Sequence, residues 1–304
     1  MLDLAVLIAP IFLIILLGRI LRITLIQEDN IWFKVNSLSY WVLFPSLLFN
    51  KTSVIDLDAF SFQLFSYVII GGFIAAFSFS YSLVKILKLK TASLTSILQG
   101  SGRHNSFVAL AIASQYLGEI GETFGTIAVA VLVTFSNLVT VIMMTYMLKS
   151  EQDSKLLLFK ELARNPFIVA ILLGLLFNIL NLEGLPVLHE LSGSLGSAAL
   201  TLALLCVGAS LRFGELKGHT ISAAIATIAK LAIFPIAVYW LAVYFDLSND
   251  MKIVAVIFAS APTSSAGYAL AKQMGGDAPL MATIISLQTL ISVLAIPAAI
   301  MIVS

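Results

Sequence analysis

Residues Ser260 to Gly267 read SAPTSSAG, a proline followed by three hydroxyl residues in the middle of an otherwise apolar segment. Proline removes a backbone donor and disfavours helix at the preceding residue, whereas Thr263, Ser264 and Ser265 are favourable residues at the start of a new helix. We therefore expect the segment to break near Pro262 and restart as a half-helix, whose free N–H groups form a ready anion site. The alternative is a proline kink in a continuous helix.

An earlier segment carries a second polar interruption, QGSGRHNS, from Gln99 to Ser106. A guanidinium inside a membrane costs at least ~2.5 kcal/mol on insertion scales, so Arg103 is expected to face protein or water. Its planar fork suits the carboxylate of an anionic substrate; alternatively, Arg103 reaches the cytoplasmic face or caps the carbonyls of a broken helix. His189 and His219 are expected at loop edges, so His104 is the one histidine within a span, and it is a candidate for proton coupling or for hydrogen bonding alone.

Lys230 lies in the middle of a third apolar segment, where an ammonium group needs oxygen partners. The carbonyl end of a broken half-helix would supply them, and the lysine would then stand where a sodium ion sits in a sodium-coupled carrier. The alternative is that Lys230 lines a watery vestibule. Asn178 and Gln288 are typical of interhelical hydrogen-bonding groups.

The overall composition is that of an integral membrane protein. Of 304 residues, 60% are apolar and 11% are charged, against about 25% charged residues in soluble domains. The 17 basic and 16 acidic residues form no basic block for a nucleic acid. The single cysteine, Cys206, excludes an intrachain disulfide, and no metal, cofactor or enzyme is indicated, because metal-ligand spacings, nucleotide motifs and nucleophile–base pairs are missing.

Apolar runs near the ~20 residues that cross a ~30 Å hydrocarbon core predict an all-α polytopic membrane protein with ten transmembrane helices. The first run has neither a positive leading segment nor a cleavage site, so we expect a retained span and not a signal peptide. We expect no carboxylate to be buried in a span. The predicted spans are 4–22, 31–50, 62–86, 93–116, 123–148, 165–182, 190–211, 219–245, 252–272 and 279–303.

The basic residues predict the orientation, because cytoplasmic loops retain Lys and Arg. They gather after the odd-numbered spans, whereas the opposite connections hold only Lys51 and Lys252. Both termini are then outside, and two halves with an odd number of spans are inverted relative to each other. We expect one membrane domain with a first five-helix repeat at 1–150, a cytoplasmic linker at 151–164 and a second repeat at 165–304.

A short internal similarity supports a duplication. Pro10 to Gly18 reads PIFLIILLG and Pro166 to Gly174 reads PFIVAILLG, each at the opening of its half. Inverted repeats with a pair of interrupted spans are the sequence indication of a secondary transporter with its binding site at the midplane.

Four longer stretches resemble the auxin efflux carrier family of permeases, in particular its bacterial malonate-transporter-like members. They are FPSLLF (Phe44 to Phe49), GRHNSFVALA (Gly102 to Ala111), LLCVGASL (Leu204 to Leu211) and APTSSAGYALAKQMGGDAPLMATIISLQTLISVLAIP (Ala261 to Pro297). The resemblance covers nearly the whole chain, and its last stretch is long and specific.

The resemblance implies two inverted five-helix repeats in which helices four and nine are broken and cross near the midplane. It also implies a scaffold of spans one, two, six and seven, and a transport domain of the others that moves in an elevator-like alternating-access cycle. Family substrates are small organic anions, mono- or dicarboxylates. Plant relatives carry a proline at the first crossing, but Leu110 to Ile112 contains none, so the position of that break stays open.

By motif, the resemblance places Asn105 and Ser106 at the first crossing and Pro262 to Ser265 at the second. Together with the residues discussed above, the expected substrate-binding residues are Arg103, His104, Asn105, Ser106, Pro262, Thr263, Ser264 and Ser265. Coupling, or substitution for a cation, is expected at Lys230 or His104.

We therefore expect a secondary active transporter of small organic anions in the cell (plasma or inner) membrane. Its partners are the anion and the lipid bilayer, without nucleic acid, and the sequence leaves a monomer and a homodimer open. The alternatives are a sodium-coupled organic anion symporter of the bile-acid-carrier type and a membrane anion sensor that does not transport.

Overall fold

The computed structural model describes residues 2–55, 62–148, 164–182, 185–212 and 218–303, and within these ranges the regular secondary structure is helical. The elements are α1 (Leu2–Thr24), α2 (Asp29–Leu38), η1 (Ser39–Leu43), α3 (Phe44–Thr52), α4 (Phe62–Ile86), α5 (Thr91–Gly102), α6 (Ser106–Met147), α8 (Pro166–Ile179), α9 (Pro186–Ser210), α10 (Thr220–Ile228), η3 (Ala229–Ile233), α11 (Phe234–Tyr244), α12 (Asn249–Ser260), α13 (Ala266–Met274) and α14 (Ala278–Val303).

Six helical segments of the described chain are long and apolar enough to cross a membrane, which confirms the predicted all-helical membrane fold. One of them, Thr91–Met147, contains two of the predicted spans. Other predicted spans are shorter or interrupted: α8 has 14 residues, and α12 ends after 12 residues. The count of ten spans stays a prediction, and the predicted linker at 151–164 lies outside the described residues except for Arg164.

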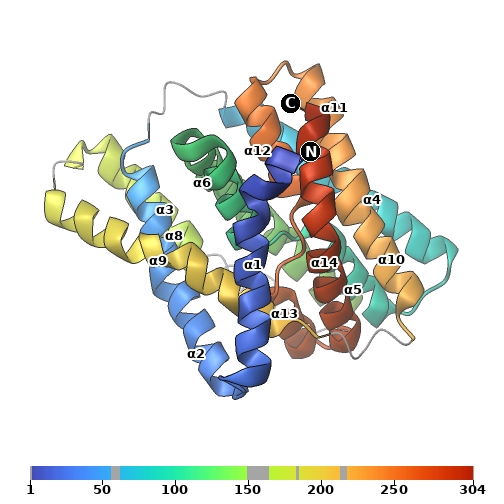
Figure 1. Cartoon of the computed structure of the whole chain (residues 1–304). Coiled ribbons are helices and arrows are strands. Elements are labelled where there is room, and N and C mark those ends of the chain that lie inside the picture. Colours follow the sequence, from blue (N-terminus) through green and yellow to red (C-terminus); the bar gives the residue numbers. More distant parts are fainter. Residues whose placement is uncertain (1, 56–61, 149–163, 183–184, 213–217, 304) are drawn as a thin grey trace.

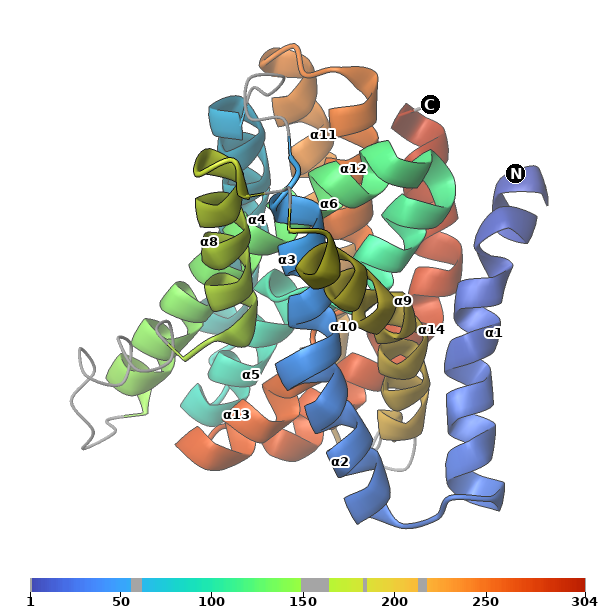
Figure 2. The same ribbon diagram turned by 90° about the vertical axis from the view of Figure 1, so that its left-hand side faces the viewer.

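The helices form two groups with α6 between them (Figures 1 and 2). In one group α9 packs against α1 and α3, and α8 packs against α3; the other contains α4, α5, α10, α11, α12 and α14. Glycines allow the closest contacts of the first group, because a Cβ at Gly18 or Gly208 would overlap the backbone across the α1–α9 contact, and one at Gly174 would overlap Thr52 of α3. Asn178 of α8 donates to two backbone carbonyls just beyond α3, as predicted for an interhelical group.

Two turns of π-helix have the same local cause. Each directly precedes a Phe-Pro pair, Phe44-Pro45 after η1 and Phe234-Pro235 after η3. A proline inside a helix lacks the N–H and its ring clashes with the carbonyl four residues earlier, and a π-helical turn widens the backbone at that point. Both turns therefore interrupt a helix without breaking it, and η3 carries Lys230.

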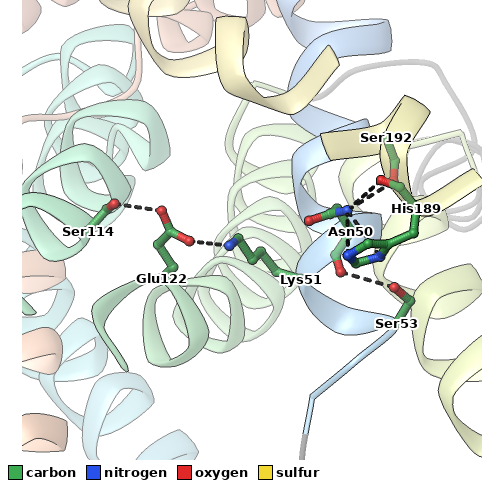
Figure 3. Close-up of polar contacts among 7 residues, drawn as sticks. All are labelled: Asn50, Lys51, Ser53, Ser114, Glu122, His189 and Ser192. Atoms are coloured by element: carbon green, nitrogen blue, oxygen red, sulfur yellow. Dashed lines mark hydrogen bonds and ion pairs between the residues drawn. The ribbon is translucent and has the colours of Figure 1, made fainter. Parts of the chain in front are cut away.

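The end of α3 is fixed by polar contacts to two neighbours (Figure 3). Asn50 Nδ2 donates to Ser192 Oγ over 3.1 Å and to the His189 carbonyl over 3.0 Å, both on α9, while Lys51 forms an ion pair with Glu122 of α6. The sequence suggested that His189 lies at the edge of a loop. Because α9 begins at Pro186, His189 lies in the first turns of a helix instead. Glu122 lies inside α6, four residues after Gly118 and between two predicted spans.

The long helix α6 consists of two helices joined by a chain reversal at Gly118, whose backbone has φ +59° and ψ −136°. Residues eight apart in a straight helix are separated by about 12 Å along the axis. Ser114 nevertheless donates to Glu122 over 2.7 Å, and a Cβ at Gly121 would overlap the Ala113 carbonyl. The chain therefore folds back at Gly118, in a conformation that favours glycine.

We expect Gly118→Ala to destabilise the protein by about 1–3 kcal/mol, because an alanine is strained in this backbone conformation. A Cβ there meets no atom within 4 Å, so the effect would be conformational and not steric. The matched control is Gly193→Ala within α9, where the new Cβ would make ordinary contacts and helix propensity favours alanine. Thermal unfolding of the purified protein in detergent compares them; equal melting temperatures would contradict the prediction.

Candidate functional site

Two interrupted helices meet in the interior. α5 ends at Gly102 and α6 begins at Ser106, while α12 ends at Ser260 and α13 begins at Ala266. The Asn105 N–H donates to the Pro262 carbonyl over 2.7 Å, so the two non-helical segments are in direct contact. The break near Pro262 is confirmed, and the continuous kinked helix is excluded. The first break lies at Arg103 to Asn105, immediately after Gly102.

Gln288 of α14 holds this crossing together. Its Nε2 donates to the Gly100 carbonyl over 2.9 Å and to the Ala226 carbonyl over 3.1 Å, and its Oε1 accepts from the Thr263 N–H over 2.9 Å. One fully buried side chain thus joins α5, α10, α14 and the break after α12. The interhelical role predicted for Gln288 is confirmed, and its importance comes from the number of backbone groups that it satisfies.

Lys230 lies at the carbonyl end of α12. Its Nζ donates to the Phe258 carbonyl over 3.3 Å and lies 4.2 Å from the centre of the Phe234 ring. The last carbonyls of a helix lack partners within it and carry the negative end of the helix dipole, so a cation is stabilised there. The prediction that a carbonyl at the end of a broken helix bonds to the Lys230 ammonium is therefore confirmed. The side chain has 0% exposed surface, which contradicts a location in a watery vestibule.

The two helices that start at the crossing differ in how their N-termini are satisfied. Asn105 caps α6, since its Oδ1 accepts from the backbone N–H groups of Phe107 and Val108. Ser265, at the corresponding position of α13, makes no side-chain capping hydrogen bond. At the start of α13 the N–H groups of Gly267 and Tyr268 donate to the backbone carbonyls of Ser264 and Ser265, and the Ser265 side chain leaves this end uncapped.

The predicted site residues divide into buried and accessible groups. Pro262 and Thr263 are buried, and the Thr263 Oγ1 donates to the Gln99 carbonyl over 3.4 Å, which gives this threonine a structural role. Arg103, Ser264 and Ser265 retain partly exposed surfaces. These three residues, one at the first break and two at the second, are the ones that a ligand can reach directly.

His104 and Ser106 form a buried pair at the first break. The Ser106 hydroxyl and His104 Nε2 are 3.0 Å apart, and the His104 ring lies 5.6 Å from the ring of Phe258. His104 Nδ1 is buried without a hydrogen-bond partner among the described residues. The contacts on its ring are thus a hydroxyl and an apolar ring, with one ring nitrogen still available.

Three further polar residues near the crossing were not singled out from the sequence. Gln99 Oε1, Thr227 Oγ1 and Ser260 Oγ are buried and find no partner within the described part of the chain. Gln99 and Ser260 lie in the last turn before each break, and Thr227 lies one turn before Lys230. This proximity to the breaks is the signal that could have identified them.

Comparison with known proteins agrees with this geometry. A family model described as membrane transport protein matches residues 4–300, nearly the entire chain. The chain belongs to this membrane transport protein family, that of the auxin efflux carriers. No curated protein matches it significantly. The members of the family are membrane transporters and not enzymes, so the crossing is a candidate transport site.

We expect Gln288→Leu to cost at least about 2 kcal/mol, because a buried polar group left without a partner costs about 1–3 kcal/mol and this change removes the side-chain partner of the Thr263 N–H and of the Gly100 carbonyl. The matched control is Gln63→Leu on α4, an exposed glutamine that donates to the Tyr67 hydroxyl, where the change should stay within about 0.5 kcal/mol. Melting temperatures in detergent compare the variants. Similar values for both would show that the Gln288 contacts do not stabilise the crossing.

Proposed function

We propose that the protein is a secondary active transporter of small organic anions, working by elevator-like alternating access, with its binding site where the two broken helices meet. The single observation that carries the proposal is the Asn105–Pro262 backbone contact, because it brings two sets of helix ends to one place. Half-helix ends in a membrane protein interior bind ions and charged substrates. Family membership supports transport itself.

For the architecture, we propose two inverted five-helix repeats with both termini outside. Packing of the duplicated sequence supports this proposal: Gly18 of α1 lies against α9, and Gly174 of α8 lies against α3. The opening helix of each half thus packs on the second span of the other half. The group formed by α1, α3, α8 and α9 would be the scaffold, and the helices around α4, α5 and α10 to α14 the transport domain (Figure 1).

For the substrate, we propose a mono- or dicarboxylate held by the N-terminus of α13. Ser264 and Ser265 offer hydroxyl donors there, Asn105 retains its Nδ2 group because only its Oδ1 caps α6, and Arg103 offers a guanidinium fork. Each donor suits a carboxylate oxygen. His104, Ser106, Pro262 and Thr263 would shape this site from buried positions.

For coupling, we propose that the Lys230 ammonium substitutes for a sodium ion. It supplies a positive charge at the carbonyl end of α12, where a sodium-coupled carrier would need a bound cation. This arrangement favours sodium-independent transport over the bile-acid-carrier type of symport. Proton coupling, where present, would use His104 or Lys230, the titratable side chains at the crossing besides Arg103.

The binding site is tested with the carboxylate that most stabilises the purified protein in a panel of mono- and dicarboxylates, since a ligand of the folded state raises its melting temperature. We expect Arg103→Ala, Ser264→Ala and Asn105→Ser to weaken its affinity about ten- to hundredfold, the effect of one hydrogen bond to a charged ligand. Asn105→Ser keeps an oxygen to cap α6 but loses the amide donors. Arg103→Lys should resemble Arg103→Ala if both arms of the fork bind the carboxylate.

The matched control for these variants is Ser82→Ala, which removes an exposed hydroxyl from α4 and should bind like the wild type. Wild-type affinity in all three single variants Arg103→Ala, Ser264→Ala and Asn105→Ser would refute the crossing site. Binding without counterflow of labelled substrate in proteoliposomes would instead identify a sensor.

Coupling is tested by uptake into proteoliposomes at several pH values with sodium or potassium as the only cation. We expect equal wild-type rates in the two salts, because Lys230 already occupies the helix end. His104→Gln or Lys230→Met should flatten any pH dependence of uptake, since each removes a titratable group. Sodium-dependent wild-type uptake would contradict the substitution by Lys230, and full pH dependence in both variants would exclude side-chain proton coupling at these positions.

A further inference from the structure

A cavity of about 610 Å³ is lined by residues of α4, α6 and the α3–α8 pair. Its floor is one face of α6, whose contributing residues recur at helical spacing: Thr126, Ile127, Ala130, Thr134, Phe135 and Leu138. Ser66 and Ile70 of α4 form one wall, and Ile168 and Leu172 of α8 form part of the other. The volume is in the roughly 300–1,000 Å³ range of single-ligand sites.

The lining suits an apolar ligand. It contains no charged residue among those that the structure describes, and three of its hydroxyl groups are already bonded within their own helices: Thr52 to Leu48, Ser66 to Phe62 and Thr134 to Ala130. A carboxylate would find no cation and no free donor along most of its length. The cavity is therefore distinct from the anion site at the helix crossing.

One polar group in the lining does lack a partner. The Thr126 hydroxyl is buried, with the residue only 1% exposed, and it has no hydrogen-bond partner among the described residues. A buried hydroxyl without a partner is costly, so an acceptor supplied by a ligand would be favourable at this point. The ligand is thus expected to be apolar along its length, with an oxygen near Thr126.

The position of the cavity indicates where such a ligand comes from. Phe62 and Leu172, on its opposite walls, are 52% and 61% exposed, so the cavity opens sideways between membrane helices. The floor from Thr126 to Leu138 is about 18 Å long at 1.5 Å per residue. This length is close to half of the ~30 Å hydrocarbon core, the depth of one leaflet.

One end of the cavity carries charge. Glu122 precedes Thr126 by one turn of α6, and its partner Lys51 directly precedes Thr52 of the cavity wall. Figure 3 shows this ion pair, with Ser114 on the other oxygen of the carboxylate. The side chains of Lys51 and Glu122 are 28% and 24% exposed, so both charges are accessible from outside the protein.

We infer that this cavity binds one acyl chain of a bilayer phospholipid. The chain lies along α6 from Thr126 toward Leu138, an ester oxygen accepts from the Thr126 hydroxyl, and the headgroup lies beside Lys51 and Glu122. A zwitterionic headgroup matches this mouth, because its phosphate faces the ammonium and its amine faces the carboxylate. This lipid site goes beyond the proposed transport function and does not depend on it.

Native mass spectrometry of the purified full-length protein, supplied with a phosphatidylethanolamine of defined chains, tests the inference. We expect one lipid retained by the wild type under activation that strips loosely bound lipids. Ala130→Trp, which fills the floor of the cavity, should abolish this retention. The matched control Ala198→Trp, at an exposed position on α9, should retain the lipid.

Thr126→Val tests the polar contact with almost no change in shape. Its lipid retention should fall about fivefold, the effect of losing one neutral hydrogen bond. This variant decides the question if Ala130→Trp fails to fold. A wild type that retains no lipid, or equal retention by the wild type, Thr126→Val and every folded tryptophan variant, would overturn the inference. Carboxylate binding at the crossing is measured separately and is not affected by either result.

Discussion

The structure depends on the need to satisfy backbone groups where two helices stop inside an apolar protein. Each break exposes carbonyls at the end of one helix and N–H groups at the start of the next, and in an apolar medium an unpaired group costs several kcal/mol. The Asn105–Pro262 hydrogen bond pairs the two breaks with each other. Gln288 and Lys230 then supply donors to the carbonyl ends, which fixes α14 and η3 against the crossing.

Local chemistry explains why the breaks themselves could be predicted. Pro262 removes a donor at a definite residue, and the polar run around Arg103 would be unfavourable in a lipid-facing helix, so both interruptions are visible in the sequence. The pairing of groups across the breaks is a tertiary property. For that reason the sequence indicated Asn105 and Thr263 as ligands but did not indicate that Asn105 Oδ1 caps α6 or that Thr263 bonds to Gln288 and Gln99.

The all-helical membrane class was equally predictable, since apolar length and the scarcity of charge are properties of composition. The ends of the helices were harder to predict, because hydropathy does not detect a reversal such as the one at Gly118 or distinguish a broken helix from two short ones. The π-helical turns before Pro45 and Pro235 show the reverse case: here proline widens a helix without ending it. A proline alone therefore does not mark a break; at Pro262 the following hydroxyl residues and the contact with Asn105 complete it.

The helix ends at the crossing differ in whether side chains bond to their backbone groups, and this difference supports the proposed anion substrate. At the crossing, the carbonyl ends of α5 and α12 receive donors from Gln288 and Lys230, so their partial negative charge is already compensated. The N-terminus of α13 receives no capping bond from Ser265, and neither break contains a carboxylate. Arg103 at the first break and Lys230 at the end of α12 are both basic residues. Their charge would repel a cation, whereas an organic anion would neutralise it.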